Sequence, residues 1–558
     1  MKIKKIHQSI GLILTACLFM IHCLQAQAKK IDLDFLKSQP QGIARDFYIW
    51  YFISQDNVDV KDAKSAYDLV WRKSPRIEQA MIQKGIEHEM PKDIYCRSLS
   101  LDKLQQEDAD CINYGLKFSQ VLEMDQKDIK NILEKLQGKQ DTLAHQIQIL
   151  KSGMKNGKQG ILNAILDSSA KDVSSILGGL SYTQKLQILD TQDLPEDKLL
   201  KLLDENNSAL NRIFTSIIVD SKFDKVKKVL THIRVKNSDT NTFFLLGINE
   251  VLYGDKKKAM EYFKDSQKVG VDPFMQDRAL FWQYLISQDK SYLQQLSQSV
   301  FADIFSITAN QILGTKPSFQ IISHFDKKAV NPYDFDITDP FAWQTLRDRI
   351  IKLNGKEFEN HLDSLYQENT LPHLVYFLSR QYRYKYNYFI FAYDHPDFWR
   401  DSYQKAMVYA IARQESHLIP SLVSTSYALG MMQIMPFNVK PFAKSMGIKE
   451  IHFFDMFDPK IALKFGSFYL DELQKEFKNP LFVAYAYNGG PGFLRRTLAK
   501  KKLFLRQREY EPWISMELLP YEESRFYGMK VLANYVIYSE ILGKKIDVLK
   551  LLEETLVF

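Results

Sequence analysis

Cysteine is scarce in this sequence, and metal-binding patterns are missing from it. The 558 residues contain four cysteines, and only Cys96 and Cys111 lie beyond residue 28. The segment His88–Lys92 begins like the helix of a zinc protease but lacks the second histidine that such a helix needs. We therefore expect no metal centre, and no pattern in the sequence indicates a cofactor.

Long hydrophobic runs are also missing after residue 28. A membrane-spanning helix needs about 20 apolar residues, so this part of the sequence offers no candidate for one. The charge balance is modest as well: the formal net charge is +7, and three lysines among the first five residues contribute to it. Such a mild balance does not indicate a nucleic-acid partner, although it suits a polyanionic surface.

The first 28 residues have the features of an export signal. The three lysines are followed by an apolar run, Ile10–Leu24, and by a small-x-small cleavage site, Ala26-Gln-Ala28. Leu14-Thr-Ala-Cys17 is similar to a lipoprotein processing box, so lipid anchoring stays open as an alternative. We expect residues 1–28 to be removed and the mature chain to be exported and soluble.

The two remaining cysteines form an even pair, which matters for an exported protein. Cys96 and Cys111 are 15 residues apart. In an oxidising compartment such a pair predicts a disulfide. Two separately buried thiols are the alternative.

Strand patterns are few, and amphipathic helical patterns dominate from residue 29 to about 384. Short helical segments follow one another closely, which predicts helical hairpins stacked as a solenoid over 29–321. The segment Phe243–Gly270 resembles a tetratricopeptide hairpin; a generic helical domain is the alternative. Proline and aspartate are dense in 322–343, so we assign 322–384 to a linker and connecting helices. The expected helices of the solenoid include 128–137, 161–176, 183–192, 197–203, 208–219 and 223–233.

One helix near the C-terminal third has an unusual acidic end. Apolar residues at helical spacing between Tyr403 and Ile411 predict a helix that is capped by Asp401 or Ser402 and ends near Ser416. Glu415 then lies in the last turn, where the helix dipole disfavours a carboxylate. If apolar residues after Gly430 cover it, its pKa rises and it can act as a general acid. The covering residues would be Met431, Met432, Ile434 and Met435.

Four short motifs follow in order from this helix. They are Glu415-Ser416 with Pro420, Gly430–Pro436, Ala486–Pro491 and Glu523–Tyr527. Together they resemble the motifs of the lysozyme-like domain of lytic transglycosylases, glycoside hydrolase family 23. Soluble members from Gram-negative bacteria carry an α-superhelix ahead of this domain. The resemblance therefore implies an all-α protein with a helical solenoid, a C-terminal lysozyme-like domain at 385–558, and a periplasmic location.

The resemblance also implies an activity. Lytic transglycosylases cleave the β-1,4 bond between MurNAc and GlcNAc in peptidoglycan without water, and they leave a 1,6-anhydro sugar. Glu415 would donate the first proton and accept the second, because no acidic partner lies within 416–438 and the acetamido group can take the second role. A hydrolase of the same bond, like goose-type lysozyme, and a non-catalytic scaffold remain as alternatives.

Supporting residues are assigned by their places in the motifs. Ser416 is expected to hold the loop after the helix, and Glu523 to orient its neighbours as a hydrogen-bond acceptor. Gly489 stands where the family usually has alanine. The predicted substrate-binding residues are Ser416, Ser424, Met432, Gln433, Tyr487, Asn488, Glu523 and Tyr527.

The expected partners are peptidoglycan strands, not nucleic acid. Proteins of cell-wall synthesis or of secretion are further candidates, and we expect a monomer. A basic group, Lys500–Lys502 with Arg495, Arg496, Arg506 and Arg508, is typical of a solvated face. Contact with the carboxylates of peptide stems is the alternative for this group.

Overall fold

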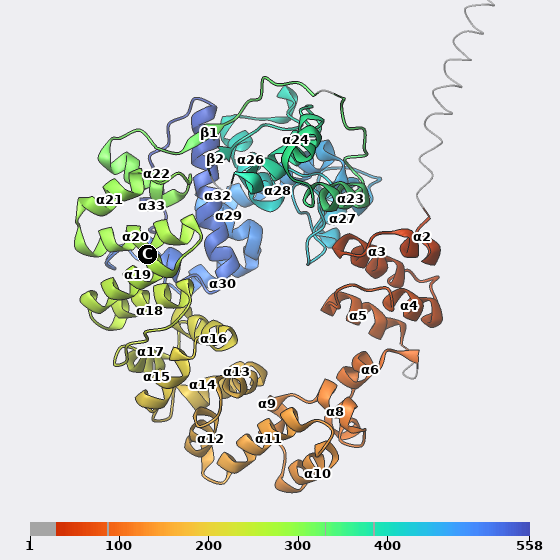
Figure 1. Cartoon of the computed structure of the whole chain (residues 1–558), viewed down its shortest axis with the longest axis vertical. Helices are drawn as coiled ribbons and strands as arrows, with labels where there is room; N and C mark the ends of the chain where they lie inside the picture. The colour runs from red at the N-terminus through yellow and green to blue at the C-terminus, as the bar shows by residue number, and fades with distance from the viewer. Residues whose placement is uncertain (1–29, 86–88, 330, 383–384) are drawn as a thin grey trace, which may run out of the picture. The chain divides into compact units, whose positions relative to one another are not determined.

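The computed structural model describes residues 30–85, 89–329, 331–382 and 385–558. The predicted export signal lies outside these residues and stays a prediction. The regular secondary structure of the described residues is almost entirely helical, and two short strands, β1 (Gln320–Ile322) and β2 (Tyr386–Tyr388), pair in parallel (Figure 1). The predicted all-α fold is therefore confirmed. Among the described residues, no helix combines the length and the apolar character needed to cross a membrane.

The chain divides into two compact units, Met1–Ser98 and Leu99–Phe558. In the first unit the buried carboxylate of Asp46 accepts hydrogen bonds from the backbone N–H groups of Trp71 (2.8 Å) and Arg72 (2.9 Å). Cys96 and Cys111, the predicted pair, are both buried and disulfide-bonded. The helices of the first unit are α2 (Leu33–Ser38), α3 (Ile43–Ile53), α4 (Val60–Tyr67), α5 (Pro75–Lys84) and α6 (Lys92–Ser98).

The second unit begins with a succession of helices that pack as neighbours along the chain. The expected helix over 161–176 is wrong, because α12 ends at Leu166 and Ser169 starts a new helix by accepting a hydrogen bond from the Asp172 N–H. The helices are α7 (Leu101–Leu104), α8 (Ala109–Gly115), α9 (Phe118–Val121), α10 (Gln126–Leu136), α11 (Asp141–Met154), α12 (Gly157–Leu166), α13 (Ala170–Gly179), α14 (Tyr182–Leu189), α15 (Glu196–Asp204), α16 (Ser208–Val219), α17 (Asp224–Leu230), α18 (Thr240–Tyr253), α19 (Lys256–Val269), α20 (Pro273–Ser287), α21 (Lys290–Ser297) and α22 (Ile304–Leu313).

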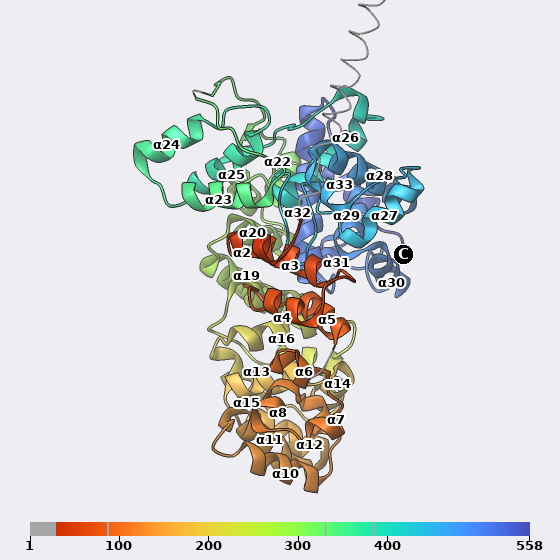
Figure 2. The same cartoon turned by 90° about the vertical axis from the view of Figure 1, so that its right-hand side faces the viewer.

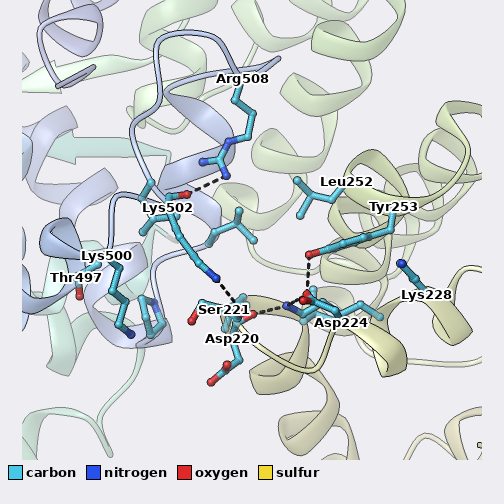
Figure 3. Close-up of a pocket in the computed structure, with 16 residues that line it drawn as sticks. Asp220, Ser221, Asp224, Lys228, Leu252, Tyr253, Thr497, Lys500, Lys502 and Arg508 are labelled. Atoms are coloured by element: carbon cyan, nitrogen blue, oxygen red, sulfur yellow. Dashed lines mark hydrogen bonds and ion pairs between the residues drawn. The ribbon is translucent and has the colours of Figure 1, made fainter. Parts of the chain in front are cut away.

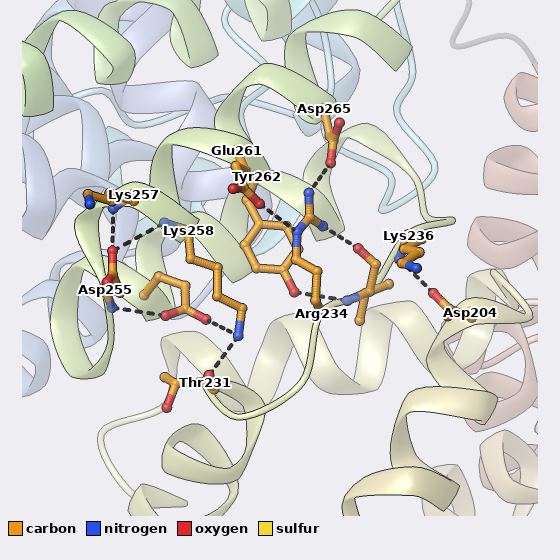
Figure 4. A network of polar contacts seen from close by, with 12 residues as sticks. Asp204, Thr231, Arg234, Lys236, Asp255, Lys257, Lys258, Glu261, Tyr262 and Asp265 are labelled. Carbon is orange, nitrogen blue, oxygen red and sulfur yellow. Dashed lines mark hydrogen bonds and ion pairs between the residues drawn. The ribbon is translucent and has the colours of Figure 1, made fainter.

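The predicted hairpin over Phe243–Gly270 is present as α18 and α19. These helices pack closely at Gly247, where a Cβ atom would lie only 2.7 Å from the ring of Phe263. Polar contacts attach the preceding loop to the hairpin (Figure 4). Arg234 stacks over Tyr262 at 4.1 Å and pairs with Asp265, and the Lys258 ammonium donates to the backbone oxygen of Thr231 at 2.6 Å. The preceding loop is therefore joined to α19 by polar and cation–π contacts.

Irregular chain follows β1, as the proline and aspartate density predicted, until helix α23 begins at Pro340. Three helices occupy the rest of this region: α23 (Pro340–Ile350), α24 (Gly355–Asp363) and α25 (Leu371–Gln381). The predicted boundaries at 321/322 and 384/385 stay predictions.

The C-terminal part of the second unit surrounds one buried helix, α26, which packs against α32 and α28 (Figure 2). Tyr409, Ala410 and Ile411 of α26 have no exposed surface. The elements of this part are η2 (Pro396–Phe398), α26 (Ser402–Ser416), α27 (Pro436–Ser445), η3 (Phe453–Phe457), α28 (Pro459–Phe477), α29 (Pro480–Gly489), α30 (Pro491–Ala499), α31 (Trp513–Glu517), α32 (Glu522–Ile541) and α33 (Val548–Glu553).

A buried ion pair joins the solenoid to this C-terminal part. Arg278 of α20 and Glu517 of α31 are 0% and 1% exposed, and the Arg278 Nη2 to Glu517 Oε2 distance is 2.6 Å. The indole N–H of Trp282 donates to the same carboxylate at 3.4 Å. Nearby, the Asn241 amide donates to Glu522 at 2.6 Å, at the first residue of α32. These contacts fix the solenoid helices beside the start of α32.

Candidate active site

Helix α26 carries the candidate acid at its C-terminal end. The helix begins after Asp401, whose carboxylate accepts a hydrogen bond from the Gln404 N–H at 2.7 Å, and it ends at Ser416. Both ends match the prediction. The next residue, His417, turns the chain with a φ of 53°. Glu415 therefore lies in the last turn, as expected.

The environment of Glu415 favours its protonated form. The Tyr527 hydroxyl donates a 2.6 Å hydrogen bond to Glu415 Oε1. The pKa of Glu415 is raised to about 7, and burial is the main cause; the Tyr527 hydrogen bond opposes the rise, and the negative charge of Glu523 adds to it. The predicted rise in pKa is confirmed. A carboxyl group with this pKa can both donate and accept a proton near neutral pH.

Glu415 opens into a cavity of about 730 Å³, named here the catalytic cavity. Residues from all four sequence motifs reach it. The predicted residues that line it are Glu415, Ser424, Gln433, Tyr487, Asn488 and Glu523.

Two loop residues in the cavity are held by backbone contacts. The Ser424 hydroxyl accepts a hydrogen bond from the Ala428 N–H at 3.0 Å, and the Gln433 amide donates to the Gly430 oxygen at 2.7 Å. Gly430 has a φ of 74°, and a Cβ atom there would lie 1.9 Å from the backbone oxygen of Met456. Only glycine fits this turn, which sets where Gln433 meets the cavity.

The third motif is tied to the second and the fourth. The Tyr487 hydroxyl donates to the Met432 oxygen at 2.6 Å, and Asn488 accepts from the Ser524 hydroxyl at 2.6 Å. At Gly489 a Cβ atom would lie 2.5 Å from the ring of Phe493. Phe493 therefore occupies the space that the alanine usual in the family would need.

Three of the predicted substrate-binding residues are not among those that line the catalytic cavity: Ser416, Met432 and Tyr527. The Ser416 hydroxyl is buried and donates to the Met431 oxygen at 2.8 Å, so it holds the loop as expected. Met432 is fully buried and packs against Gly466 of α28. Ser416 and Met432 therefore stabilise the second motif, and Tyr527 contacts Glu415 instead of lining the cavity. The predicted cover of Glu415 by Met431, Met432, Ile434 and Met435 stays a prediction.

The motifs did not reveal one wall of the cavity. Arg212, Thr215, Ser216 and Val219 line it from α16 of the solenoid. Their spacing of i, i+3, i+4 and i+7 places them on one face of that helix. This spacing is visible in the sequence, but nothing local indicates that the face meets a site about 200 residues further along the chain.

Comparison with known proteins identifies part of this region. The family model described as "Transglycosylase SLT domain" matches residues 397–508. The matched residues include Glu415 and the first three motifs, while the fourth motif, Glu523–Tyr527, lies beyond the match.

Curated relatives are similar to about a quarter of the chain. The soluble lytic murein transglycosylase of Salmonella typhimurium is 32% identical over 138 residues, 24% of this chain and 21% of that protein. The protein of the same name from Escherichia coli K12 is 33% identical over 138 residues, with the same coverage of 24% and 21%. The chain thus aligns with about a fifth of the length of these relatives.

Solved structures are similar over a longer stretch at lower identity. The 70-kDa soluble lytic transglycosylase of Escherichia coli is 18% identical with a TM-score of 0.49, covering 92% of this chain and 83% of that one. An inactive variant of the lytic transglycosylase Slt of Pseudomonas aeruginosa is 16% identical with a TM-score of 0.46, covering 91% and 79%.

Proposed function

We propose that this protein is a lytic transglycosylase that cleaves the β-1,4 bond between MurNAc and GlcNAc in peptidoglycan. The observation that carries the proposal is the Glu415 carboxyl group, which has a pKa of about 7, is held by Tyr527, and faces the catalytic cavity. The SLT domain match over 397–508 and the names of the curated relatives support it.

The proposed reaction uses Glu415 twice. Protonated Glu415 donates its proton to the bridging oxygen, the bond from that oxygen to C1 of MurNAc breaks, and GlcNAc leaves with a free hydroxyl. The acetamido oxygen of MurNAc stabilises the positive charge at C1. The 6-hydroxyl then attacks C1 and returns its proton to ionised Glu415. The product is a 1,6-anhydro sugar, and no water is consumed.

A hydrolase of the same bond is the second candidate, and one observation favours it. Glu523 lines the same cavity, and its charge acts on Glu415. A second carboxylate beside the acid is the arrangement by which many glycosidases activate water. In our proposal, Glu523 instead tunes the acid and accepts a hydrogen bond from the Asn488 amide, which lies 3.5 Å away.

The substitution Glu415→Gln tests the proposal. It keeps the shape of the side chain but removes the proton, so cleavage of purified peptidoglycan should fall by about 10²–10⁴-fold while glycan binding persists. Glu522→Gln is the matched control, because Glu522 lines the same cavity but pairs with Asn241 and not with Glu415. Undiminished cleavage by Glu415→Gln would refute the proposal, and absence of cleavage by the wild type would favour the non-catalytic scaffold.

Export to the periplasm is part of the same proposal. The pattern of residues 1–28 and the disulfide-bonded state of Cys96 and Cys111 support it, because disulfides persist in oxidising compartments. The monomeric state and the protein partners named from the sequence stay predictions.

A further inference from the structure

Two other cavities differ in their relation to the catalytic cavity. The one drawn in Figure 3, of about 500 Å³, shares Val219 and Pro520 with it, and Lys502 connects its two sides by donating to the backbone oxygen of Ser221 at 3.1 Å. This cavity extends the site already described. The other, of about 310 Å³, shares no lining residue with either of them among the described residues. We call it the rear cavity.

The rear cavity lies on the side of α26 that faces away from Glu415. Arg413 lines it, and two residues along an α-helix correspond to about 200° of rotation, so Arg413 and Glu415 leave α26 in nearly opposite directions. Helix α32 forms a second wall through Lys530 and Asn534, and α25, β2 and the segment before α22 complete the cavity. The helices α26 and α32 therefore contribute to both the catalytic cavity and the rear cavity.

Two half-buried cations line the rear cavity, and neither has a carboxylate partner among the described residues. Arg413 donates to the backbone oxygen of Tyr388 at 2.8 Å and to the amide oxygen of Asn534 at 2.6 Å, and both of these acceptors are neutral. The Lys530 ammonium lies 5.0 Å from the centre of the Phe274 ring. Burial lowers the pKa of Arg413, as expected for a cation that is removed from water without a counter-ion.

One acidic residue, Asp303, lines the rear cavity, but its carboxyl group does not balance these charges. Its Oδ1 accepts hydrogen bonds from the N–H groups of Phe305 (2.9 Å) and Ser306 (2.8 Å) at the start of α22. Burial and then the charge of Asp277 raise the pKa of Asp303 well above its usual range, so the neutral acid is favoured. The cavity thus contains two cations without a counter-charge, and a concave site of this kind attracts anions.

We propose that the rear cavity binds a small organic oxyanion, whose carboxylate or phosphate group lies between Arg413 and Lys530. The planar guanidinium group of arginine matches the geometry of both kinds of oxyanion. Ser379 and Gln414 also line the cavity, and their side chains form no hydrogen bond within the described residues, so a hydroxyl and an amide are available as further donors. The volume of about 310 Å³ is at the lower end for ligand sites, so the ligand is small.

An oxyanion in this position joins the two helices of the candidate active site. Arg413 precedes Glu415 by two residues on α26, and Lys530 follows Tyr527 by three residues on α32. The bound anion would therefore add a second link between the helices that the Tyr527–Glu415 hydrogen bond already connects. A ligand that binds only the folded protein raises its unfolding midpoint. Neither binding nor unfolding needs catalysis, so the inference is independent of the proposed function.

Calorimetric titration of the full chain with inorganic phosphate and with succinate tests the inference. Sodium chloride keeps the ionic strength constant, and succinamide is the uncharged control for succinate. The wild type should bind at least one of the two anions but not succinamide, and that anion should raise the unfolding midpoint. Binding of phosphate alone would identify a phosphorylated ligand, and binding of succinate alone a carboxylic acid. If the wild type bound neither anion, the inference would be overturned.

Variants then locate the bound anion. Lys530→Gln should weaken binding about tenfold, Lys530→Arg keeps the charge and should bind like the wild type, and Ser379→Ala, which changes no charge, should weaken binding about threefold. Lys464→Gln is the matched control, because Lys464 of α28 is exposed and lines none of the three cavities, so its binding should be unchanged. Circular dichroism checks that each variant is folded. Unchanged binding by Lys530→Gln and Ser379→Ala, or an equal loss in Lys464→Gln and Lys530→Gln, would overturn the inference.

Discussion

Tyr527 donates a 2.6 Å hydrogen bond to Glu415 from a helix that begins 107 residues after the acid. Glu523, one turn earlier on the same helix, acts on Glu415 through its charge. The two effects have opposite signs: the hydrogen bond favours the ionised carboxylate, and the charge favours the neutral acid. Burial raises the pKa of Glu415 most, and the start of α32 adjusts that pKa in both directions.

Tyr527→Phe should move the pH profile upward. Removing the hydroxyl removes a contact that lowers the pKa of Glu415, so the acid stays protonated to higher pH. The alkaline limb of kcat/KM, expected near pH 7 in the wild type, should shift to higher pH, and kcat should fall about tenfold because the carboxyl group is no longer held. Initial rates measured across pH check this. A limb that moves to lower pH would contradict it.

Glu523→Gln should move the same limb in the other direction. Removing the negative charge removes an effect that raises the pKa of Glu415, so the acid loses its proton at lower pH. The alkaline limb should shift downward, with a smaller loss of kcat than for Glu415→Gln. Glu522→Gln serves again as the control. If Glu523→Gln abolished turnover as Glu415→Gln does, Glu523 would be a second catalyst, as in the hydrolase alternative.

Breaking the buried ion pair between Arg278 and Glu517 should lower the stability of the protein, because the charge that remains would be enclosed without a partner. Arg278→Met leaves Glu517 charged and enclosed, which costs about 3–5 kcal/mol. The thermal unfolding midpoint should drop clearly. The double variant Arg278→Met/Glu517→Leu removes both charges and should recover most of the loss. A double variant as unstable as the single one would show that packing, and not the unpaired charge, is responsible.

Local sequence patterns predicted the helix that carries the acid well. The Asp401 cap and the apolar spacing that follows it are signals within a few residues of the helix, and both ends of α26 agree with them. The error at 161–176 has a local cause as well. Ser169 with Asp172 three residues later is a helix start, but the apolar period continued across it and hid the break.

Contacts between distant segments could not be predicted in the same way. The motifs indicated Glu415, Tyr487 and Glu523, because the chemistry restricts which residues can stand there. Arg212 reaches the catalytic cavity from the solenoid, and its position depends on how α16 packs beside residues 520–525. Met432 shows the converse: it lies in a motif, but its side chain fills the space beside Gly466 and does not reach the cavity.

Mass spectrometry of the soluble products released from purified peptidoglycan tests the central claim most directly. If the 6-hydroxyl closes on C1 as proposed, every new end is one water lighter than the corresponding reducing-end muropeptide, and borohydride leaves it unchanged. Reducing ends alone, each carrying the added water, would contradict the account and identify a hydrolase.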